Sequence, residues 1–255
     1  MNISGILSIN KSGINGLQNN MDNIANNIAN SETIGYKNRN TTFQELVNNQ
    51  TTAQEANLTA GTNLGLNTGV GVNSESVNFA QGSLQQTGKT TDFAIQGQGF
   101  FGIYNQNGEL LLTRDGSFTR DSTGQLVNAS GNKVAVDATI PEISWPSGDL
   151  NVASDGNISI VNNGISTSVG KLRMYLPQNN EDLVSAGNNN YTVKNGDKLQ
   201  VMANPSIKQG YLEASTVDLA DSMTDMIATQ RAYQMNAKAL QSTDDIFEVI
   251  NRLAN

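Results

Sequence analysis

Three aspartates near the C-terminus have a spacing that could do chemistry. Asp218, Asp221 and Asp225 lie three and four residues apart, so a helix would place their carboxylates on one face, where they could bind a cation. Acidic residues are also favoured in the first turns of a helix, because the helix dipole is positive there. The dipole accounts for all three residues without a ligand. The spacing therefore indicates the start of a helix rather than a metal site.

Two loop motifs resemble ligand sites but lack what those sites need. The segment Gln96-Gly97-Gln98-Gly99 contains GxG, yet no third glycine follows and the next residues have the pattern of a strand. A dinucleotide-binding loop needs that third glycine and a helix after it. The segment from Asp115 to Asp121 lacks the alternating oxygen ligands of a calcium loop. We expect tight turns at both places, and no cofactor or metal.

The composition excludes most catalytic machinery. The 255 residues include no cysteine and no histidine, so Ser-His-Asp triads, Cys-His dyads and zinc sites with histidine ligands cannot form. A Ser-Lys pair or two placed carboxylates would remain, as in a glycoside hydrolase acting on envelope polymers, but no pair of acids stands out. The net charge of −8 and the lack of a basic run argue against nucleic-acid binding. We therefore predict that the protein is not an enzyme and has neither a nucleic acid nor a small-molecule substrate as its partner.

The N-terminal segment has a seven-residue apolar repeat. Two positions three residues apart recur, as in the seam of a coiled coil, with Asn10 interrupting the second. The residues between them are Asn, Ser, Gly and Gln rather than charged pairs, and such uncharged flanks can be buried by hydrogen bonding against other protein. The repeat consists of Leu7, Ile14, Met21 and Ile28 at one position and Ile3, Leu17 and Ile24 at the other.

The C-terminal segment has the same periodicity. Ser215 and Asp218 are spaced as a capping box, and no glycine or proline occurs between Leu212 and Asn255. This pattern predicts a long helix that begins near Asp218. Its repeat consists of Leu219, Met226, Tyr233, Leu240 and Phe247, supported by Met223, Ile227, Ala237, Ile250 and Leu253.

Between the ends the sequence changes character twice. Residues 36–75 are rich in Thr and Asn and predict an extended connector with one short helix. Residues 76–205 show strands and turns, including a hairpin at Asn107-Gly108. The strands are expected near residues 92–96, 100–104, 109–113, 117–120, 125–128, 133–136, 157–161, 168–176 and 199–203.

These patterns predict an α+β fold class. Paired N- and C-terminal coiled-coil-type helices would carry an inserted all-β domain. The expected parts are an N-terminal helix in residues 1–35, the connector in 36–75, the β domain in 76–205 and a C-terminal helix in 206–255. We expect the helices to be loose in the monomer and ordered by association. The alternative is an intramolecular helical hairpin that only holds the chain ends together.

Gly35 is expected to mark the end of the first helix. A glycine after a helix often takes a positive φ, which stops the helix and redirects the chain. The residues Gly35, Tyr36 and Lys37 would then form the junction between the helix and the connector.

Several stretches resemble one known family. Residues 25–30 (ANNIAN) followed by 33–37 (TIGYK) resemble a segment shared by bacterial flagellar rod and hook axial proteins. QGYLEASTVDLADSMTDMIATQRAYQMNAKAL, residues 209–240, resembles the C-terminal motif of that family. QGSLQQTGKTTDFAIQGQGFF and LTRDGSFTRDSTGQLVNASG resemble its β domain. The likeness covers nearly the whole chain in the expected order.

The resemblance implies a structural subunit of the flagellar rod in the basal body of the cell envelope. Such a subunit polymerises through its terminal helices into a tubular drive shaft that transmits torque to the hook. Its partners would be copies of itself as a helical homopolymer, other axial proteins of the proximal rod and hook, and the flagellar type III export apparatus. The first residues do not resemble a cleavable signal peptide, which agrees with that export route.

Within the family, the length and the segments QGSLQQTG, TRDGSF and QRAY are most similar to the distal rod proteins. A proximal rod protein is the alternative, and a β-rich surface adhesin or binding module is an alternative of a different class. The residues expected at the assembly interface are Ile3, Leu7, Ile14, Leu17, Met21, Ile24, Asn26, Asn27, Ile28, Asn30, Leu219, Met223, Met226, Gln230, Arg231, Tyr233, Ala237, Leu240 and Phe247.

Overall fold

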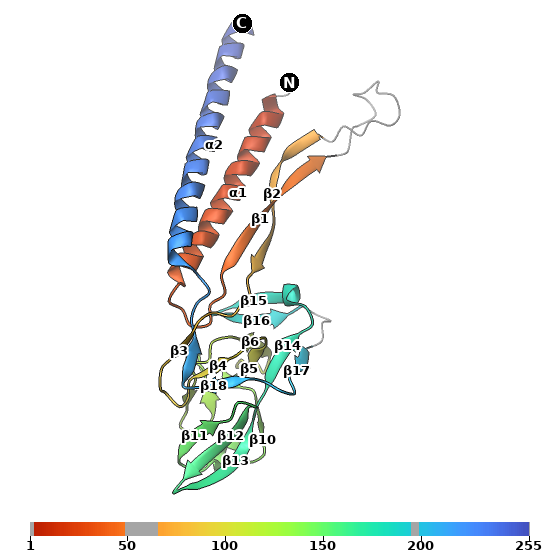
Figure 1. The fold of residues 1–255 in the computed structure, drawn as a ribbon. Helices are drawn as coiled ribbons and strands as arrows, with labels where there is room; N and C mark the ends of the chain where they lie inside the picture. Colours follow the sequence, from red (N-terminus) through yellow and green to blue (C-terminus); the bar gives the residue numbers. More distant parts are fainter. Residues whose placement is uncertain (1–2, 49–65, 195–198, 255) are drawn as a thin grey trace. The chain divides into compact units, whose positions relative to one another are not determined.

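A computed structural model describes residues 3–48, 66–194 and 199–254. The chain divides into two compact units (Figure 1). The helical unit consists of Met1–Ala29, Arg39–Val77 and Asp218–Asn255. The β unit consists of Asn30–Asn38 and Asn78–Val217. The chain therefore passes between the units four times, and each unit is assembled from segments that are distant in sequence.

The helical unit contains two helices and a two-stranded ribbon among its described residues. Helix α1 (Ile3–Ala29) packs against α2 (Leu219–Ala254) and also against the ribbon formed by β1 (Arg39–Asn48) and β2 (Leu66–Val77). The ribbon is antiparallel, with register shifts between Thr42 and Phe43 and between Leu46 and Val47. A two-stranded ribbon is marginally stable alone, so its packing on α1 is what holds it in place.

Asparagine side chains of α1 bind the ribbon. The Nδ2 of Asn27 donates to the carbonyl of Arg39 over 2.8 Å, and the N–H of Arg39 donates back to Asn27 Oδ1 over 2.9 Å. Asn23 Nδ2 donates to Thr41 Oγ1 over 2.7 Å. Both asparagines are buried. An amide carries a donor and an acceptor, so Asn27 can pair with a strand backbone as a neighbouring strand would. The asparagine content of α1 is thus explained in part within the chain itself.

The predicted fold class, paired N- and C-terminal coiled-coil-type helices with an inserted all-β domain, is wrong. Most elements are strands, and the β1–β2 ribbon belongs to the same unit as the helices. The two helices also lack a continuous apolar seam. One heptad position of α2 is apolar and half-buried at Met226, Tyr233 and Leu240. A second heptad position of α2, which is also buried or half-buried, is polar. It consists of Ser222, Thr229, Asn236 and Thr243.

The polar seam position carries its own contacts. Asn20 Nδ2 of α1 donates to Thr229 Oγ1 of α2 over 3.2 Å. Gly13 of α1 leaves room for Asn236, whose Nδ2 would lie 3.6 Å from a Cβ at that position. Small and polar residues thus face each other where a coiled coil would place leucine or isoleucine.

The segment predicted as a connector forms the ribbon instead. No helix occurs among the described residues of the range 36–75, and the remainder of that range lies outside the described part. Strand β1 is exposed from Thr42 to Leu46, which fits its mainly polar sequence, although Phe43 and Leu46 are apolar and about half exposed.

The β unit contains antiparallel sheets. Its largest sheet runs in the order β15-β16-β6-β5-β9-β8-β7, with β14 joined to β5 and to β17. A second sheet runs β10-β13-β12-β11, and the pairs β18–β4 and β19–β3 are separate. The first strands are β3 (Leu84–Gln86), β4 (Phe93–Ile95), β5 (Phe100–Tyr104), β6 (Leu110–Thr113), β7 (Thr119–Arg120), β8 (Leu126–Val127), β9 (Lys133–Val134) and β10 (Val136–Ala138). The others are β11 (Asp149–Val152), β12 (Asn157–Asn162), β13 (Ile165–Leu172), β14 (Met174–Pro177), β15 (Leu183–Gly187), β16 (Asn190–Val193), β17 (Leu199–Val201), β18 (Ile207–Gln209) and β19 (Tyr211–Glu213), with short 3-10 helices at Glu142–Ser144 and Asn180–Asp182.

The hairpin predicted at Asn107-Gly108 is confirmed. Strands β5 and β6 pair antiparallel from Phe101↔Thr113 to Tyr104↔Leu110. Gly108 has a φ of +80°, a conformation that side chains other than glycine's rarely tolerate.

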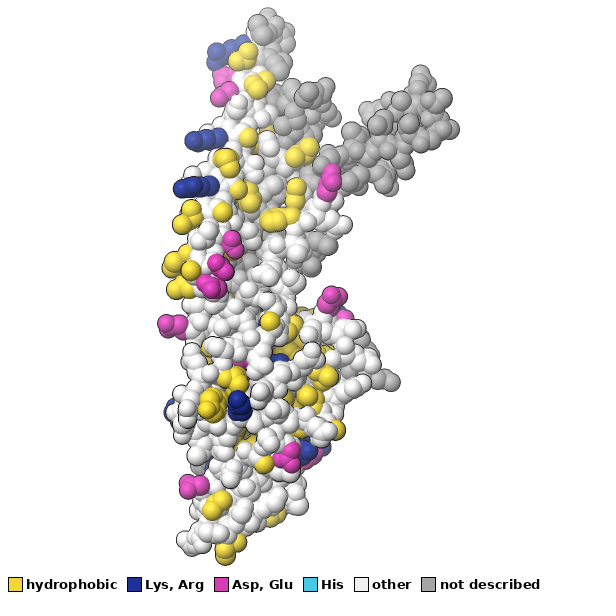
Figure 2. All heavy atoms as spheres, in the orientation of Figure 1, with side chains coloured by type: hydrophobic (Ala, Val, Ile, Leu, Met, Phe, Trp, Pro, Cys, Tyr) yellow, Lys and Arg dark blue, Asp and Glu magenta, His cyan; other side chains and the backbone are white. Residues whose placement is uncertain are grey.

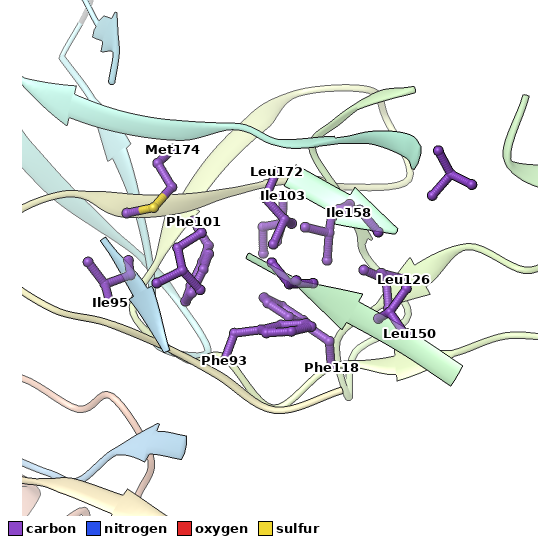
Figure 3. Close-up of a cluster of buried hydrophobic side chains, with 14 of the residues drawn as sticks. Phe93, Ile95, Phe101, Ile103, Phe118, Leu126, Leu150, Ile158, Leu172 and Met174 are labelled. Atoms are coloured by element: carbon purple, nitrogen blue, oxygen red, sulfur yellow. The ribbon is translucent and has the colours of Figure 1, made fainter. Parts of the chain in front are cut away.

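The β unit has its own hydrophobic core (Figure 3). Phe93, Phe101 and Phe118 are fully buried, and the rings of Phe101 and Phe118 meet edge to face with centroids 5.4 Å apart. The cluster continues through Ile158 and Leu172 of the second sheet. Both sheets therefore share one core, and the unit does not depend on another chain to bury it.

We predict that Ile158→Ala lowers the free energy of unfolding of the β unit by about 2–5 kcal/mol, because it leaves a cavity in this core. Ile165→Ala is the matched control, since Ile165 is 71% exposed, and it should change stability by less than about 0.5 kcal/mol. Denaturant unfolding followed by the fluorescence of Trp145 measures both. Equal stabilities for the two variants would contradict the assigned core.

Candidate functional site

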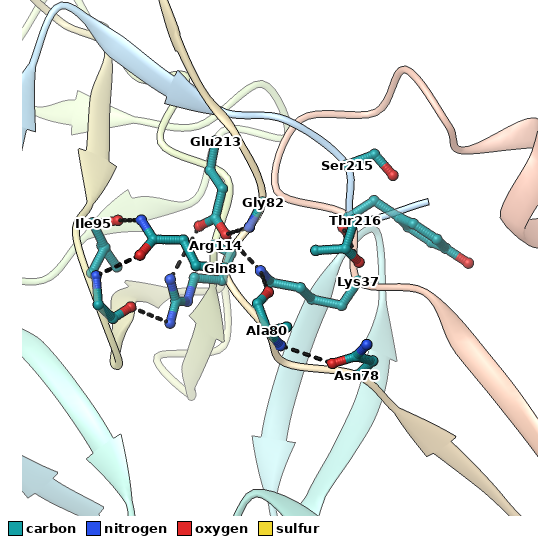
Figure 4. A network of polar contacts seen from close by, with 12 residues as sticks. Lys37, Asn78, Ala80, Gln81, Gly82, Ile95, Arg114, Glu213, Ser215 and Thr216 are labelled. Atoms are coloured by element: carbon teal, nitrogen blue, oxygen red, sulfur yellow. Dashed lines mark hydrogen bonds and ion pairs between the residues drawn. The ribbon is translucent and has the colours of Figure 1, made fainter. Parts of the chain in front are cut away.

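A buried carboxylate joins three segments of the β unit (Figure 4). Glu213, the last residue of β19, accepts a hydrogen bond from Lys37 Nζ at Oε1 over 2.6 Å and one from Arg114 Nη1 at Oε2 over 3.1 Å. The backbone N–H of Gly82 donates to the same Oε1 over 2.8 Å. Lys37 precedes the ribbon, Arg114 follows β6 and Gly82 precedes β3. One side chain thus holds together three parts of the chain.

The charges of this network are shielded from water. The side chains of Lys37 and Glu213 are 0% and 1% exposed, and that of Arg114 is 3% exposed. Burial lowers the pKa of the Lys37 ammonium and of the Arg114 guanidinium, while the hydrogen bonds and charge of Glu213 act in the opposite direction on both. Because one carboxylate serves two cations, it cannot be removed without leaving two buried positive charges.

The remaining polar atoms of the two cations are largely satisfied. Lys37 Nζ also donates to the carbonyl of Ala80 over 2.6 Å, and Arg114 Nη2 donates to that of Gly97 over 3.0 Å. The guanidinium lies 5.2 Å from the centre of the Phe100 ring, a cation–π contact. Arg114 Nε makes no hydrogen bond within the part of the chain that the structure describes.

Backbone hydrogen bonds also bring together the residues of the β unit at which the chain passes to or from the helical unit. The N–H of Thr216 donates to the carbonyl of Tyr36 over 3.1 Å, and Thr216 Oγ1 accepts from the N–H of Asn38 over 2.9 Å. Asn78 donates its N–H to the carbonyl of Asn38 over 2.9 Å. Asn38, Asn78 and Thr216 all lie at or close to points where the chain passes from one unit to the other. We call Gly35–Asn38, Asn78–Gly82, Arg114 and Glu213–Thr216 the junction cluster.

Glycine permits the close approaches in the junction cluster. A Cβ on Gly35 would lie 2.6 Å from the backbone carbon of Arg114, and one on Gly82 would lie 2.2 Å from the carbonyl oxygen of Ala214. Gly35 has the expected positive φ, +65°. However, α1 ends at Ala29, so Gly35 does not stop the helix as predicted. Its N–H instead donates to the carbonyl of Glu213 over 2.7 Å, which requires the turn to be tight.

Sequence reasoning identified Gly35, Tyr36 and Lys37 but missed Glu213 and Arg114. Glu213 directly follows the apolar strand end Tyr211–Leu212, and Arg114 directly follows the buried end of β6. A charged residue beside a strand end is normally exposed, so neither position alone indicates a buried pair.

The α1 residues predicted at the assembly interface differ in burial. Ile24 and Asn27 are buried, whereas Asn26 is exposed and Asn30 lies in the β unit. The half-buried members are Leu7, Ile14, Leu17, Met21 and Ile28. Ile3 lies in the first turn of α1, and its side chain is outside the described part.

The residues predicted on α2 do not form one seam. Met226, Tyr233, Ala237 and Leu240 are half-buried on the side that faces α1, and Phe247 lies in α2 with its side chain outside the described part. Leu219, Met223, Gln230 and Arg231 are exposed.

A second apolar face of α2 is open to solvent (Figure 2). Its large residues are between 51% and 66% exposed, and they are spread over the side of α2 that is turned away from α1. We call this set the outer face of α2. It consists of Met223, Ile227, Met235, Ile246 and Val249, while Leu219, also exposed, belongs to the heptad position of Met226 and Tyr233. A helix that is apolar on two sides can bury both only by packing against two neighbours, and α1 is one of these neighbours.

The predicted cap of α2 needs a correction. Asp218 Oδ1 accepts from the N–H groups of Ala220 and Asp221 over 2.9 and 3.2 Å, so Asp218 itself caps the helix. Ser215 does not take part in that cap, since its hydroxyl accepts from the N–H of Val217. The first turn of α2 holds the acidic residue Asp221, as the helix dipole favours.

The two ligand-like loops are turns. Gly97 and Gly99 have φ values of +100° and +116°, and the N–H of Gly97 donates to Gln81 Oε1. Asp121 Oδ1 accepts from the Thr123 hydroxyl and from the N–H groups of Thr123 and Gln125, and these bonds hold the pKa of Asp121 below its usual value. Among the described residues, no three acidic side chains are grouped to hold a metal ion.

Comparison with known proteins gives a consistent result. The family model described as flagellar basal body rod FlgEFG protein C-terminal matches residues 208–253, and the one described as flagellar hook protein FlgE/F/G D1 domain matches residues 94–160. The matched segments contain β19 with Glu213, most of α2, and strands β5 to β11 of the β unit. Within the described residues, no helix is long and apolar enough to cross a membrane.

Curated relatives match along almost the whole chain. Flagellar basal-body rod protein FlgG of Buchnera aphidicola subsp. Acyrthosiphon pisum is 36% identical, over 97% of this chain and 98% of the relative. Proteins of the same name are 34% identical in Bacillus subtilis, over 94% and 97%, and 33% identical in Borreliella burgdorferi, over 95% and 96%.

We predict that Glu213→Gln destabilises the β unit by about 3–5 kcal/mol, because the amide leaves two buried cations without a countercharge. Glu248→Gln is the control, since the Glu248 side chain is 64% exposed, and it should cost less than about 1 kcal/mol. Thermal unfolding of both purified variants measures the difference. Wild-type stability in Glu213→Gln would show that the network is not needed.

We predict that Gly35→Val disrupts the junction cluster while the core around Trp145 stays folded. The branched side chain would meet the backbone of Arg114 and Asp115. Gly88→Val is the matched control, because Gly88 also has a positive φ but nothing lies within 4 Å of its Cβ position. The control should cost about 1–2 kcal/mol for the backbone alone, and Gly35→Val clearly more. A fully motile strain that carries Gly35→Val would contradict this role.

Proposed function

The chain belongs to the family of flagellar basal-body rod proteins, and we propose that it builds the rod by polymerising with copies of itself through α1 and α2. It is a structural subunit of the rod in the flagellar basal body, and it assembles there with other rod and hook components. The family is structural, which agrees with a protein that is not an enzyme.

The outer face of α2 carries this proposal. Burying one large aliphatic side chain is worth about 1.5–3 kcal/mol, and the outer face exposes several of them in one stripe. The adjacent residues of α2 include Gln230, Gln234 and Ala239, which can be buried at a small desolvation cost, and the charged residues Arg231 and Lys238, which need partners if they are buried. A helical hairpin that only held the chain ends together would have no use for an apolar stripe on its outer side.

The β unit differs in this respect. Its core is closed within the chain, whereas α2 is left with an apolar side uncovered. We therefore assign the helical unit to the inner core of the rod, where protein surrounds it on all sides, and the β unit to the outer layer. The contact between copies is heterologous, since a head-to-tail contact that does not close produces a filament.

The relatives named FlgG favour a place in the distal rod over one in the proximal rod, as the segments QGSLQQTG and QRAY do. In that place the subunit would transmit torque through packed neighbours to the hook, without any chemistry. Delivery through the flagellar type III export apparatus completes the proposal, and it fits terminal helices whose apolar residues find their partners only after assembly.

We predict that Ile227→Asp abolishes rod assembly, because it places a charge in the centre of a buried contact. Ile227→Leu keeps the apolar volume and should assemble normally. Basal bodies from a strain lacking the gene, complemented with each variant, show the difference by electron microscopy. Thermal unfolding of the β unit should be unchanged in both, and complete rods built from Ile227→Asp would refute the proposed contact.

A further inference from the structure

We propose that neighbouring copies in the rod pack their α2 helices side by side with an axial offset of thirteen residues, set by two charge pairs. Thirteen residues of α-helix correspond to about 20 Å. The pairs join Asp218 of one copy to Arg231 of the next, and Asp225 to Lys238. This inference rests on the proposed assembly through the helices, and it adds the register at which the helices meet.

The middle of α2 has a basic side, which ends before Asp245, seven residues after Lys238. Arg231 and Lys238 are both exposed, and they lie seven residues apart, so they project from the same side of the helix on successive double turns. Ile227 and Met235 lie four residues before and after Arg231 and flank it on that side. The basic side therefore coincides with the outer face of α2, where apolar residues can exclude water from an ion pair.

Another side of α2 is acidic. Asp218 and Asp225 are exposed and also lie seven residues apart. They project about 140° around the helix from the basic side, near the flank of the side that packs on α1. Asp218 caps the helix through one of its two carboxylate oxygens, Oδ1. Figure 2 shows acidic and basic side chains in separate stretches along this part of the molecule.

The equal spacing within the two pairs selects one offset. Because seven residues separate Asp218 from Asp225 and seven separate Arg231 from Lys238, a single shift of thirteen residues brings both acids level with both bases. Without an offset, the acids of one copy would lie level with residues 218 and 225 of the next copy, so neither acid would meet Arg231 or Lys238. The spacing thus favours the shifted register over the unshifted one.

The occupant of the outer face is consequently a second copy of this chain. The contact uses two different sides of α2, basic on one copy and acidic on the next, so each copy can bind one neighbour on each side. A repeated contact of this kind does not close between two copies and leads to an open filament. The apolar residues supply the driving force, while the charges determine the register.

The test reverses one charge at a time. Asp225→Lys places two lysines level with each other, and Lys238→Asp places two aspartates level, so each variant alone should reduce the number of complete rods about tenfold or more. Rods are counted by electron microscopy of basal bodies in a strain lacking the gene. Asp221→Lys is the matched control, because Gln234 lies thirteen residues after Asp221 and the helix dipole is perturbed at least as strongly by a lysine in the first turn. It should assemble normally.

Coexpression makes the test specific. A copy with Asp225→Lys and a copy with Lys238→Asp form complementary pairs at every contact when they alternate, so the two defective variants together should restore rods to near the wild-type number. The same rescue is expected when both substitutions are in one chain. It also shows that each variant folds.

Three results would overturn the inference. Normal rods from either single variant would show that the pair is not needed, and failure of the coexpressed variants would show that these residues do not meet at this offset. Both leave the assembly through α2 intact, since that claim depends on Ile227. Complete rods in the strain without any copy of the gene would overturn the proposed function as well.

Discussion

The buried carboxylate of Glu213 is the interaction on which the architecture depends. The helical unit is made of three chain segments that are separated by segments of the β unit. These three segments can pack together only if the chain enters and leaves the β unit at points that lie close to one another. Glu213 holds Lys37 and Arg114 by ion pairs, and its own strand end brings Thr216 to Tyr36 and Asn38. A buried ion pair contributes little net stability but is very costly to break, so this one acts mainly to fix which segments meet.

The two units differ in how they bury their apolar side chains. In the β unit, aromatic and aliphatic residues of both sheets close a core within one chain. In the helical unit, hydrogen-bonding side chains such as Asn23, Asn27 and Thr229 hold the contacts inside the chain, and large apolar residues such as Met223 and Ile227 are exposed. The usual arrangement of an isolated helix pair is thus partly reversed. That reversal is what a rod subunit needs, because its neighbours in the rod can supply the missing apolar contacts.

Local patterns in the sequence predicted the elements that depend on local physics. The Asn107-Gly108 turn predicted the β5–β6 hairpin, and the long segment without glycine or proline predicted α2. The fold class failed because the heptad count considered only the apolar positions and ignored Ser222, Thr229, Asn236 and Thr243 between them. The β1–β2 ribbon was missed because its polar residues pair with asparagines of α1, a contact between elements that no periodicity reveals. Glu213 was missed because a charged residue at a strand end is normally exposed, and only its two distant cations show otherwise.

The measurement that tests the central claim most directly is electron microscopy of basal bodies from a strain in which this gene is deleted in frame. A structural subunit of the distal rod predicts basal bodies that stop at short rods and carry no hook. Restoring the gene should restore both the rod and the hook. Intact rods and hooks in the deletion strain, with normal swimming, would contradict the account.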